Sequence, residues 1–472
     1  MKEINMVLKS EVENPLIEPI PFHVERLKTS FSEGTTRDIH WRISQLVQLK
    51  KMLQEKESKF LEALSLDLHK GEQEAWVAEI GFVISDINHT VKHLVKWCRP
   101  RYVTTPLFAQ PGKSYSLPEP LGTVMIIGAW NYPFQLVLAP LVAAIAAGNC
   151  VVIKPSEVAE HSARLLAELI PLYLDTDCYH VVLGAVEETQ VLLQQNVDHI
   201  FYTGGEAVAK IILKAAADYL IPVTLELGGK SPCIVDTDTN LDVTSSRIVW
   251  SKWMNAGQTC VAPDYLLVEE RFVGSLIETL IAKIERFYGA NPMESQDYGR
   301  IINLRHFDRL ARYLEGQNVV YGGHVNREKK YLSPTIILAP DDQSLVMQEE
   351  VFGPILVVLP IKNKVDAIRV INSKPKPLAL YLYTNDKSFE QHVLQRTSSG
   401  NVGVNDGMMF MANANLPFGG VGESGMGSYH GKTGFDTFSH LKTVMKRSFL
   451  LDVALRYPPF NRFKLNVLKK LL

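Results

Sequence analysis

Between Gly122 and Glu226 the chain alternates short runs of apolar, often β-branched residues with longer amphipathic segments. The short runs predict five strands, TVMIIGAW, CVVIK, HVVLG, HIFYTG and IPVTLEL, and the longer segments predict four intervening helices. This alternation favours a parallel, doubly wound sheet. Such sheets bind ligands beyond the carboxyl ends of their strands. Functional residues are therefore expected directly after the strands, at 129–132, 154–157 and 203–205.

A second alternation runs from about residue 228 to 405, with the strand-like runs SPCIVD, YLLVEE, TIILA, PILVVLP and LALYLYT. It predicts a second α/β domain. Residues 36–100 carry apolar residues at helical spacing. Residues 101–118 change to Pro, Gly and Thr, which is compatible with a hairpin that bridges domains or subunits. A chain of 472 residues has room for about three domains.

Composition excludes several classes of protein. The 49 Lys and Arg balance 51 Asp and Glu, so a dedicated nucleic-acid binder is not expected. The five cysteines are scattered without a CxxC motif, which argues against a disulfide framework or a zinc site and favours a reducing compartment. We predict no catalytic metal. The first residues lack a long apolar core, so no signal peptide is expected.

One apolar stretch, from Phe134 to Ile153, is long enough for a membrane span, which needs about 20 residues. Gly148 and Asn149 interrupt it as a helix stop, and a β-branched run follows. The stretch is therefore predicted to be a buried helix followed by a strand.

Several chemically capable residues stand at strand ends or in small-residue loops, and each also has a plain structural interpretation. Cys260, in NAGQTCVAP, is either a buried small hydrophobe or a nucleophile with small polar neighbours. Glu226 precedes two glycines and is either a general base or a solvated carboxylate. Asn131 is either an oxyanion donor or a turn residue. Lys154 and Glu157 are candidate contacts to a ribose or phosphate.

Two glycine-rich patterns near the C-terminus resemble nucleotide motifs. GVGESG at residues 420–425 matches GxGxxG, but it follows no strand and leaves too little chain for a βαβ unit. HGKT lacks the first glycine of a phosphate loop, because position 426 is Met426. A loop in which glycines let backbones approach closely is the preferred interpretation.

Taken together, the motifs identify a family. The ordered set GAWNYPF, VVIKPSE, FYTGGEAVAK, LELGGKSP, NAGQTCVAPDY, QEEVFGPIL and LPFGGVGESGMGSYHGK resembles the NAD(P)-dependent aldehyde dehydrogenase superfamily. The resemblance extends from about residue 25 to residue 450. The CVAPDY and GMGSYHGKTGFDTFSH segments are most similar to the class 3 and fatty aldehyde dehydrogenase branch.

The resemblance implies catalytic roles. Cys260 would attack the aldehyde carbonyl to give a thiohemiacetal, and loss of a hydride to the nicotinamide would leave a thioester. Asn131, with the Cys260 backbone amide, would hold the oxyanion, and Glu226 would activate the hydrolytic water. The implied cofactor-binding residues are Trp130, Lys154, Glu157, Gly204, Gly205, Val208, Glu350 and Phe352. The implied substrate-pocket residues are Tyr132, Trp250, Met254, Thr259 and Phe418.

The cofactor turn departs from the family pattern. The family has Gly-Ser-Thr and a second glycine five positions after the first, whereas this chain has Gly204, Gly205 and Glu206, with Ala209 at the later position. The missing hydroxyl and the added acid bear on cofactor affinity. A carboxylate at Glu157 would repel a 2′-phosphate, so the expected cofactor is NAD, with NADP accepted as this branch often does.

The resemblance also implies an α/β fold with a Rossmann-like cofactor domain (20–100 and 119–226) and a second α/β catalytic domain with the nucleophilic cysteine (227–410). A small β oligomerisation element (101–118 and 411–450) and a basic amphipathic tail (451–472) complete it. The expected activity is oxidation of medium- to long-chain aliphatic, aromatic or apocarotenal-type aldehydes to acids. The alternatives are a CoA-acylating or semialdehyde-specific enzyme, or a non-catalytic structural or membrane-surface protein that keeps the fold.

The C-terminal tail leaves its role open. Residues 445–472 hold seven Lys and Arg and one acid. A short basic amphipathic helix there would lie on an anionic membrane, cap the substrate tunnel, pack on a partner subunit, or simply be a solvated terminus. We expect a cytoplasmic homodimer, with peripheral membrane contact through this tail as one interpretation.

Overall fold

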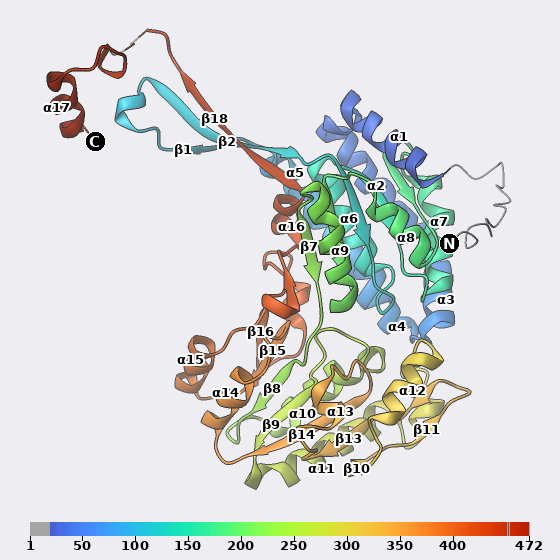
Figure 1. Cartoon of the computed structure of the whole chain (residues 1–472). Helices are drawn as coiled ribbons and strands as arrows, with labels where there is room; N and C mark the ends of the chain where they lie inside the picture. Colours follow the sequence, from blue (N-terminus) through green and yellow to red (C-terminus); the bar gives the residue numbers. More distant parts are fainter. Residues whose placement is uncertain (1–18, 451, 453, 472) are drawn as a thin grey trace, which may run out of the picture.

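The predicted strands of the first alternation form one mixed sheet in the order β17-β7-β6-β3-β4-β5, parallel except at the β17 edge. The computed structural model describes residues 19–450, 452 and 454–471. The sheet is the core of the upper lobe in Figure 1. Its strands are β3 (Thr123–Ile127), β4 (Cys150–Lys154), β5 (Tyr179–Val181), β6 (His199–Thr203), β7 (Val223–Glu226) and β17 (Gly425–Met426).

The helices between these strands cover the sheet. They are α6 (Gln135–Ala147), α7 (Glu160–Tyr173), α8 (Val186–Leu193) and α9 (Glu206–Tyr219). Every residue of α6 is buried, and Gly148 ends the helix with φ 94°. The apolar stretch is thus a buried helix followed by strand β4. Within the described residues, no helix combines the length and apolarity that crossing a membrane requires.

Further helices from the N-terminal part of the chain pack around α6 and α7. Those that contact α6 or α7 are α2 (Ile39–Glu55), α3 (Glu57–Leu68) and α5 (Phe82–Trp97), whereas α1 (Ile20–Glu33) packs on β3, β4 and α8, and α4 (Glu72–Ala75) packs on α3. A π-helical stretch, Trp76–Gly81, joins α4 to α5. The N-terminal segment on which the signal-peptide expectation rests lies outside the described residues.

The second lobe is built on a seven-stranded sheet in the order β10-β13-β14-β9-β8-β15-β16. Its strands are β8 (Pro232–Val235), β9 (Tyr265–Glu269), β10 (Val319–Tyr321), β13 (Thr335–Leu338), β14 (Ile355–Ile361), β15 (Ala379–Tyr383) and β16 (Asn401–Val404). Its helices are α10 (Leu241–Trp253), α11 (Glu270–Tyr288), α12 (Leu304–Arg312), α13 (Leu345–Gln348), α14 (Lys364–Asn372) and α15 (Lys387–Arg396). A small ribbon pairs β11 (Val325–Asn326) with β12 (Tyr331–Leu332). The predicted α/β fold is confirmed.

An arm of three antiparallel strands projects from the upper lobe (Figure 1). It consists of β1 (Arg101–Val103), β2 (Gly112–Pro120) and β18 (Ser439–Arg447), so segments more than 300 residues apart pair along nine positions. The tail helix α17 (Arg462–Leu471) lies beyond the tip of this arm.

The glycine-rich segment before the arm brings backbones together. A Cβ on Gly420 would lie 2.0 Å from Ser424 O, and one on Gly425 would lie 2.3 Å from Leu225 O. This close approach lets β17 pair with β7, and α16 (Gly431–Thr437) then packs against α5 and α6. Residues 411–450 therefore contribute to the first sheet as well as to the arm.

Candidate active site

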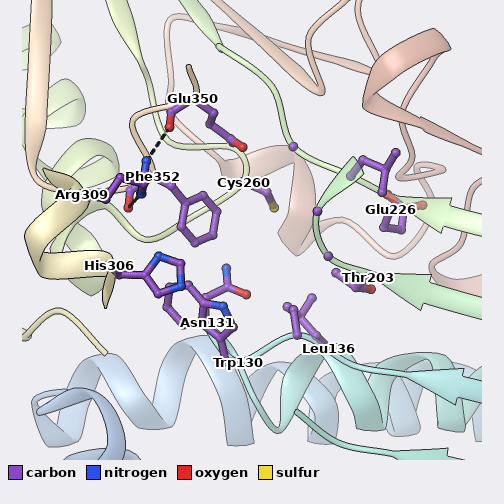
Figure 2. Close-up of a pocket in the computed structure, with 15 residues that line it drawn as sticks. Trp130, Asn131, Leu136, Thr203, Glu226, Cys260, His306, Arg309, Glu350 and Phe352 are labelled. Atoms are coloured by element: carbon purple, nitrogen blue, oxygen red, sulfur yellow. Dashed lines mark hydrogen bonds between the residues drawn. The ribbon is translucent and has the colours of Figure 1, made fainter. Parts of the chain in front are cut away.

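A cavity of about 260 Å³ lies where the carboxyl ends of β3, β6 and β7 face loops of the second lobe (Figure 2). Its walls are mostly apolar. Two of the three strand-end segments expected from the sequence, 129–132 and 203–205, contribute to it, and 154–157 does not. The lining residues are Ala129, Trp130, Asn131, Leu136, Thr203, Gly204, Gly205, Glu226, Leu227, Gly228, Cys260, His306, Arg309, Glu350 and Phe352.

Cys260 reaches the cavity from a tightly held loop. After α10 the chain reverses through Asn255 and Ala256, which have φ angles of 54° and 50°. Gln258 Nε2 donates to the carbonyl oxygens of Asn255 (3.0 Å) and Arg300 (2.9 Å). Left-handed backbone at two non-glycine residues is unfavourable and persists only where the surroundings impose it. The loop therefore holds Cys260 in a fixed place.

The thiol is hard to ionise in this setting. Burial raises the pKa of Cys260 to about 12, and the neighbouring carboxyls of Glu350 and Glu226 add to the increase. The backbone amides of Cys260 and Val261 oppose it by hydrogen bonding to the sulfur. A thiolate in this cavity therefore requires a further source of positive charge or polarity.

Asn131 faces the cavity from the loop after β3 and is held at both of its ends. Its Nδ2 donates to Gln258 O at 3.0 Å. Its backbone oxygen accepts from Lys70 Nζ at 3.0 Å and from Asn255 Nδ2 at 2.8 Å. An amide nitrogen carries two hydrogens, so one remains to donate to an atom in the cavity.

Glu226 ends β7 and is buried, with 3% of its surface exposed. Neither carboxyl oxygen has a hydrogen-bond partner among the described residues. Burial raises the pKa of Glu226 well above its usual value. An unpartnered carboxyl of this kind is a candidate for proton transfer to or from a bound molecule.

Glu350 and Phe352 lie on a loop that Arg309 of α12 clamps. The guanidinium donates to the carbonyl oxygens of Glu350 at 3.1 Å and Val351 at 2.9 Å. Phe352 has a φ of 46°, so the loop is strained where its ring meets the cavity. Burial raises the pKa of Glu350 to about 8. Trp130 packs edge-on against Phe352, with ring centroids 5.4 Å apart.

The comparisons with known proteins agree on one family. The profile of the aldehyde dehydrogenase family matches residues 23–444. The chain belongs to the aldehyde dehydrogenase family. It is 47% identical over 446 residues to aldehyde dehydrogenase family 3 member A2 of Pongo abelii, covering 94% of this chain and 92% of the relative. It is 48% identical over 439 residues to a dimeric, NADP-preferring aldehyde dehydrogenase of Canis lupus familiaris, covering 92% and 97%.

A solved structure supports the same assignment. The substrate-bound state of Staphylococcus aureus AldH superposes with a TM-score of 0.94 at 45% identity, covering 96% of this chain and 99% of that one. This aldehyde dehydrogenase is therefore an oxidoreductase that oxidises aldehydes with NAD(P). The relatives do not favour the alternative activities considered from the sequence.

The residues of this aldehyde dehydrogenase fit a dinucleotide. Thr203 Oγ1 is buried without a hydrogen-bond partner among the described residues, and a Cβ on Gly205 would meet no atom within 4 Å. Gly205 immediately precedes α9, whose free N–H groups favour a phosphate. Beyond β4, Lys154 Nζ lies 3.4 Å from Glu157 Oε2, beside a separate hollow that Glu157 lines. An ammonium and a carboxylate together suit the donors and acceptors of ribose hydroxyls.

The unusual turn is partly compensated in the structure. The carboxylate of Glu206 pairs with Lys210 at 2.5 Å, so the added acid beside the turn has its own counter-ion. Ala209 is buried and fits its position. Val208 lies on the exposed face of α9 and lines neither the catalytic cavity nor the hollow at Glu157.

The five residues expected in the substrate pocket differ in burial and in their contacts. Tyr132 and Thr259 are buried and hydrogen-bond to each other through their hydroxyls at 2.8 Å. Phe418 is buried and stacks on His430 at 5.2 Å. Met254 is half-buried, and Trp250 lies on α10 with 38% of its surface exposed. None of the five lines the catalytic cavity itself.

Sequence reasoning missed His306, Arg309 and Leu136, which line the cavity. His306 stacks obliquely on Trp130 at 4.8 Å, and burial lowers its pKa to about 4, so it is neutral. His306 and Arg309 lie on α12, which carries no motif that distinguishes it from a surface helix. Leu136 follows GAWNYPF by two positions and lies on α6, where every residue is buried, so its helical phase gives no signal that it lines the cavity.

Proposed function

We propose that Cys260 is the nucleophile, Asn131 the oxyanion donor and Glu226 the general base in the oxidation of apolar aldehydes. The observation that carries this proposal is the single cavity that all three side chains line from separate segments. Its mostly apolar walls favour aliphatic or aromatic substrates over charged semialdehydes.

In the proposed reaction, Cys260 Sγ bonds to the carbonyl carbon as the thiol loses its proton to solvent water. The remaining Asn131 Nδ2 hydrogen and the Cys260 backbone N–H stabilise the negative oxygen. When bound, NAD(P) supplies the hydride acceptor that this oxidation requires. Cys260 then carries the acyl group as a thioester. Glu226 takes a proton from water, the hydroxide breaks the C–S bond, and the carboxylic acid leaves with the thiol restored.

The same proposal assigns the cofactor contacts. Lys154 and Glu157 would hold the adenosine ribose, the turn at Gly204 and Gly205 the pyrophosphate, and Glu350 the other ribose, with Trp130 and Phe352 beside the ring and Val208 on the α9 side. The Glu157 carboxylate supports a preference for NAD, although the relative from Canis lupus familiaris is named NADP-preferring. Glu157→Gln should therefore improve the use of NADP relative to NAD.

The test is NADH formation with aldehydes of increasing chain length and with one small semialdehyde. We expect kcat/KM to rise with apolar length. Cys260→Ser should abolish turnover, and Glu226→Gln should give a burst of NADH followed by little steady turnover. Turnover of the semialdehyde alone would refute the apolar substrate class, and retained activity in Cys260→Ser would refute the nucleophile.

We also propose that the enzyme is a cytoplasmic homodimer that associates through the arm. Its outer strands carry exposed apolar side chains, among them Tyr102, Leu441 and Met445. The relative from Canis lupus familiaris is named dimeric. Charged substitutions at Leu441 and Met445 should halve the mass measured by sedimentation; an unchanged mass would move the interface elsewhere.

The tail supports a second, narrower proposal. In α17 and the segment before it, Phe460 and Phe463 are largely exposed beside the cations of Arg462 and Lys464. Such a surface suits peripheral contact with an anionic membrane. Removing residues 457–472 should abolish co-sedimentation with vesicles containing phosphatidylserine. If the deletion instead changes only the chain-length preference, the tail covers the substrate entrance.

A further inference from the structure

Behind the Asn131 loop lies an ion pair that is wholly removed from water. Lys70 Nζ and Glu79 Oε1 are 2.5 Å apart, and neither side chain has any exposed surface. Lys70 directly follows the α3 C-cap residue His69, and Glu79 lies in the π-helical stretch Trp76–Gly81. A fully buried pair contributes little net stability, because desolvation of both charges offsets their attraction. The pair is therefore better explained by the backbone groups that it holds in place than by a gain in stability.

The Lys70 ammonium has three close partners, two of them through hydrogen bonds. One goes to Glu79, and one goes to the backbone oxygen of Asn131 at 3.0 Å. The ammonium also lies over the ring of Tyr132, 4.0 Å from its centroid. Lys70 thus contacts both residues at the start of the loop that presents the Asn131 amide.

Glu79 holds the far end of the same loop. Its Oε2 accepts the backbone N–H groups of Phe134 and Gln135, each at 3.0 Å. Gln135 begins α6, where a carboxylate is favoured by the free amides and the helix dipole. One ion pair therefore fixes positions 131 and 134–135 at once.

The loop is also tied to the nucleophile segment. Asn255 Nδ2 donates to Asn131 O at 2.8 Å, Asn131 Nδ2 donates to Gln258 O at 3.0 Å, and Tyr132 bonds to Thr259. These bonds set where the free Asn131 hydrogen points relative to Cys260. Without Lys70, the carbonyl oxygen of Asn131 keeps only its hydrogen bond from Asn255, so we expect this peptide to be held less firmly.

We propose that Lys70, paired with Glu79, is a positioning residue that aims the Asn131 amide at the reacting carbonyl oxygen. The inference rests on the proposed oxyanion role of Asn131. Lys70 touches none of the residues proposed to hold the ribose or pyrophosphate. Its loss should therefore slow formation of the thioester without weakening cofactor binding, because a displacement of about 1 Å at a reacting group can cost about 100-fold in rate.

The test compares three variants by rapid mixing: Lys70→Met/Glu79→Gln, Asn131→Ala and the combination. Replacing both members leaves neither Lys70 nor Glu79 as an unpaired buried charge, and the side-chain amide oxygen introduced by Glu79→Gln can still accept from the α6 amides. The readouts are the rate of the first NADH turnover at saturating aldehyde and the KM for NAD. Lys283→Met, which removes another buried lysine, here paired with the largely exposed Asp242 in the second lobe, is the control.

We expect the pair variant to slow the first turnover 10- to 100-fold with KM for NAD within twofold of wild type, and the control to stay within twofold in both. In the Asn131→Ala background, removing the pair should cost no more than twofold, because the group it positions is gone. Equal fold-losses in both backgrounds would show a general structural effect and overturn the inference. A pair variant with wild-type rate would overturn it too.

The two proposals fail differently. If Asn131→Ala retains the wild-type rate, the oxyanion role itself is wrong and the inference falls with it. If Asn131→Ala is slow and the pair variant is not, only the inference fails. Should the pair variant be too unstable to purify, Lys70→Gln/Glu79→Gln also removes both charges and replaces the long ammonium side chain with a shorter, polar one. It enters the same comparison with the same expected outcomes.

Discussion

Three acidic groups, Cys260, Glu226 and Glu350, share one small cavity, and each is harder to ionise there than in water. Burial is the first cause for all three, and the carboxyls reinforce the effect on the thiol. The free enzyme therefore holds the Cys260 thiol in its protonated form. A cationic ring bound among these groups would favour their anions, which couples reactivity to cofactor binding.

The first prediction concerns alkylation of Cys260 in the cofactor-free enzyme. Because the thiol pKa is about 12, the thiolate fraction and the rate of carbamidomethylation by iodoacetamide should rise about tenfold per pH unit from pH 7 to 10. Glu350→Gln removes a carboxyl with a pKa of about 8, so above pH 8 it should make alkylation faster. Mass spectrometry of the Cys260 peptide measures the rate, with Cys260→Ser as the blank. A rate that levels off by pH 8 would contradict the raised pKa.

Some residues of the site could be predicted from the sequence and others could not. Cys260, Glu226 and Asn131 stand in distinctive motifs, and the chain brings all three to one cavity. Lys70 and Glu79 stand in HKGEQEAWVAE, which resembles any solvated helical surface. Their burial depends on α6 packing over them, a long-range contact that no local pattern encodes.

At the scale of elements, the strands of both sheets follow from their β-branched apolar runs, and the helices follow from their periodicity. The residues at which helices end also depend on contacts with distant parts of the chain. Gly148 ends α6 in a left-handed conformation, and Arg42 of α2 covers it while donating to Thr36 O, Arg37 O and Ala146 O. The sequence predicts the helix stop at Gly148 but not the arginine that lies against it, more than a hundred positions earlier in the chain.

The second prediction uses this glycine. A Cβ at Gly148 would lie 2.5 Å from the Arg42 guanidinium, and φ there is 94°. Gly148→Ala should destabilise the protein by about 1–2 kcal/mol from backbone strain, plus the cost of displacing Arg42. Gly274→Ala is the matched control, because Gly274 lies exposed within α11 with no described atom within 4 Å of its Cβ. It should be neutral or stabilising by about 0.5–1 kcal/mol. The measurement is the thermal unfolding midpoint of Gly148→Ala and of Gly274→Ala. Equal midpoints for the two variants would contradict the predicted backbone strain at Gly148.

At the scale of the whole molecule, one segment of the chain contributes to both the first sheet and the arm, which the sequence pattern does not reveal. The motif at residues 420–425, which the sequence predicts as a loop, supplies β17 to the first sheet before the chain enters the arm. The division into domains drawn from the sequence remains a prediction at its borders, because residues 411–450 contribute to both. His199 marks this junction: it lies on β6, bonds to Thr224 of β7 at 3.1 Å and packs edge-on against Phe438, just before β18.

The last prediction follows from that histidine. Burial lowers the pKa of His199 to about 4, and its exposed fraction is 4%. The unfolded chain binds a proton near pH 6.5 and the folded chain only near pH 4, so stability is lost as pH falls through this window, by about 1.4 kcal/mol per pH unit and about 3 kcal/mol in all. His199→Gln keeps a partner for Thr224 but cannot take up the proton. Its thermal midpoint should therefore fall less than that of wild type between pH 6.5 and 4.5. His392→Gln, at an exposed position on α15, should track wild type; parallel curves for all three proteins would show that His199 does not carry this acid sensitivity.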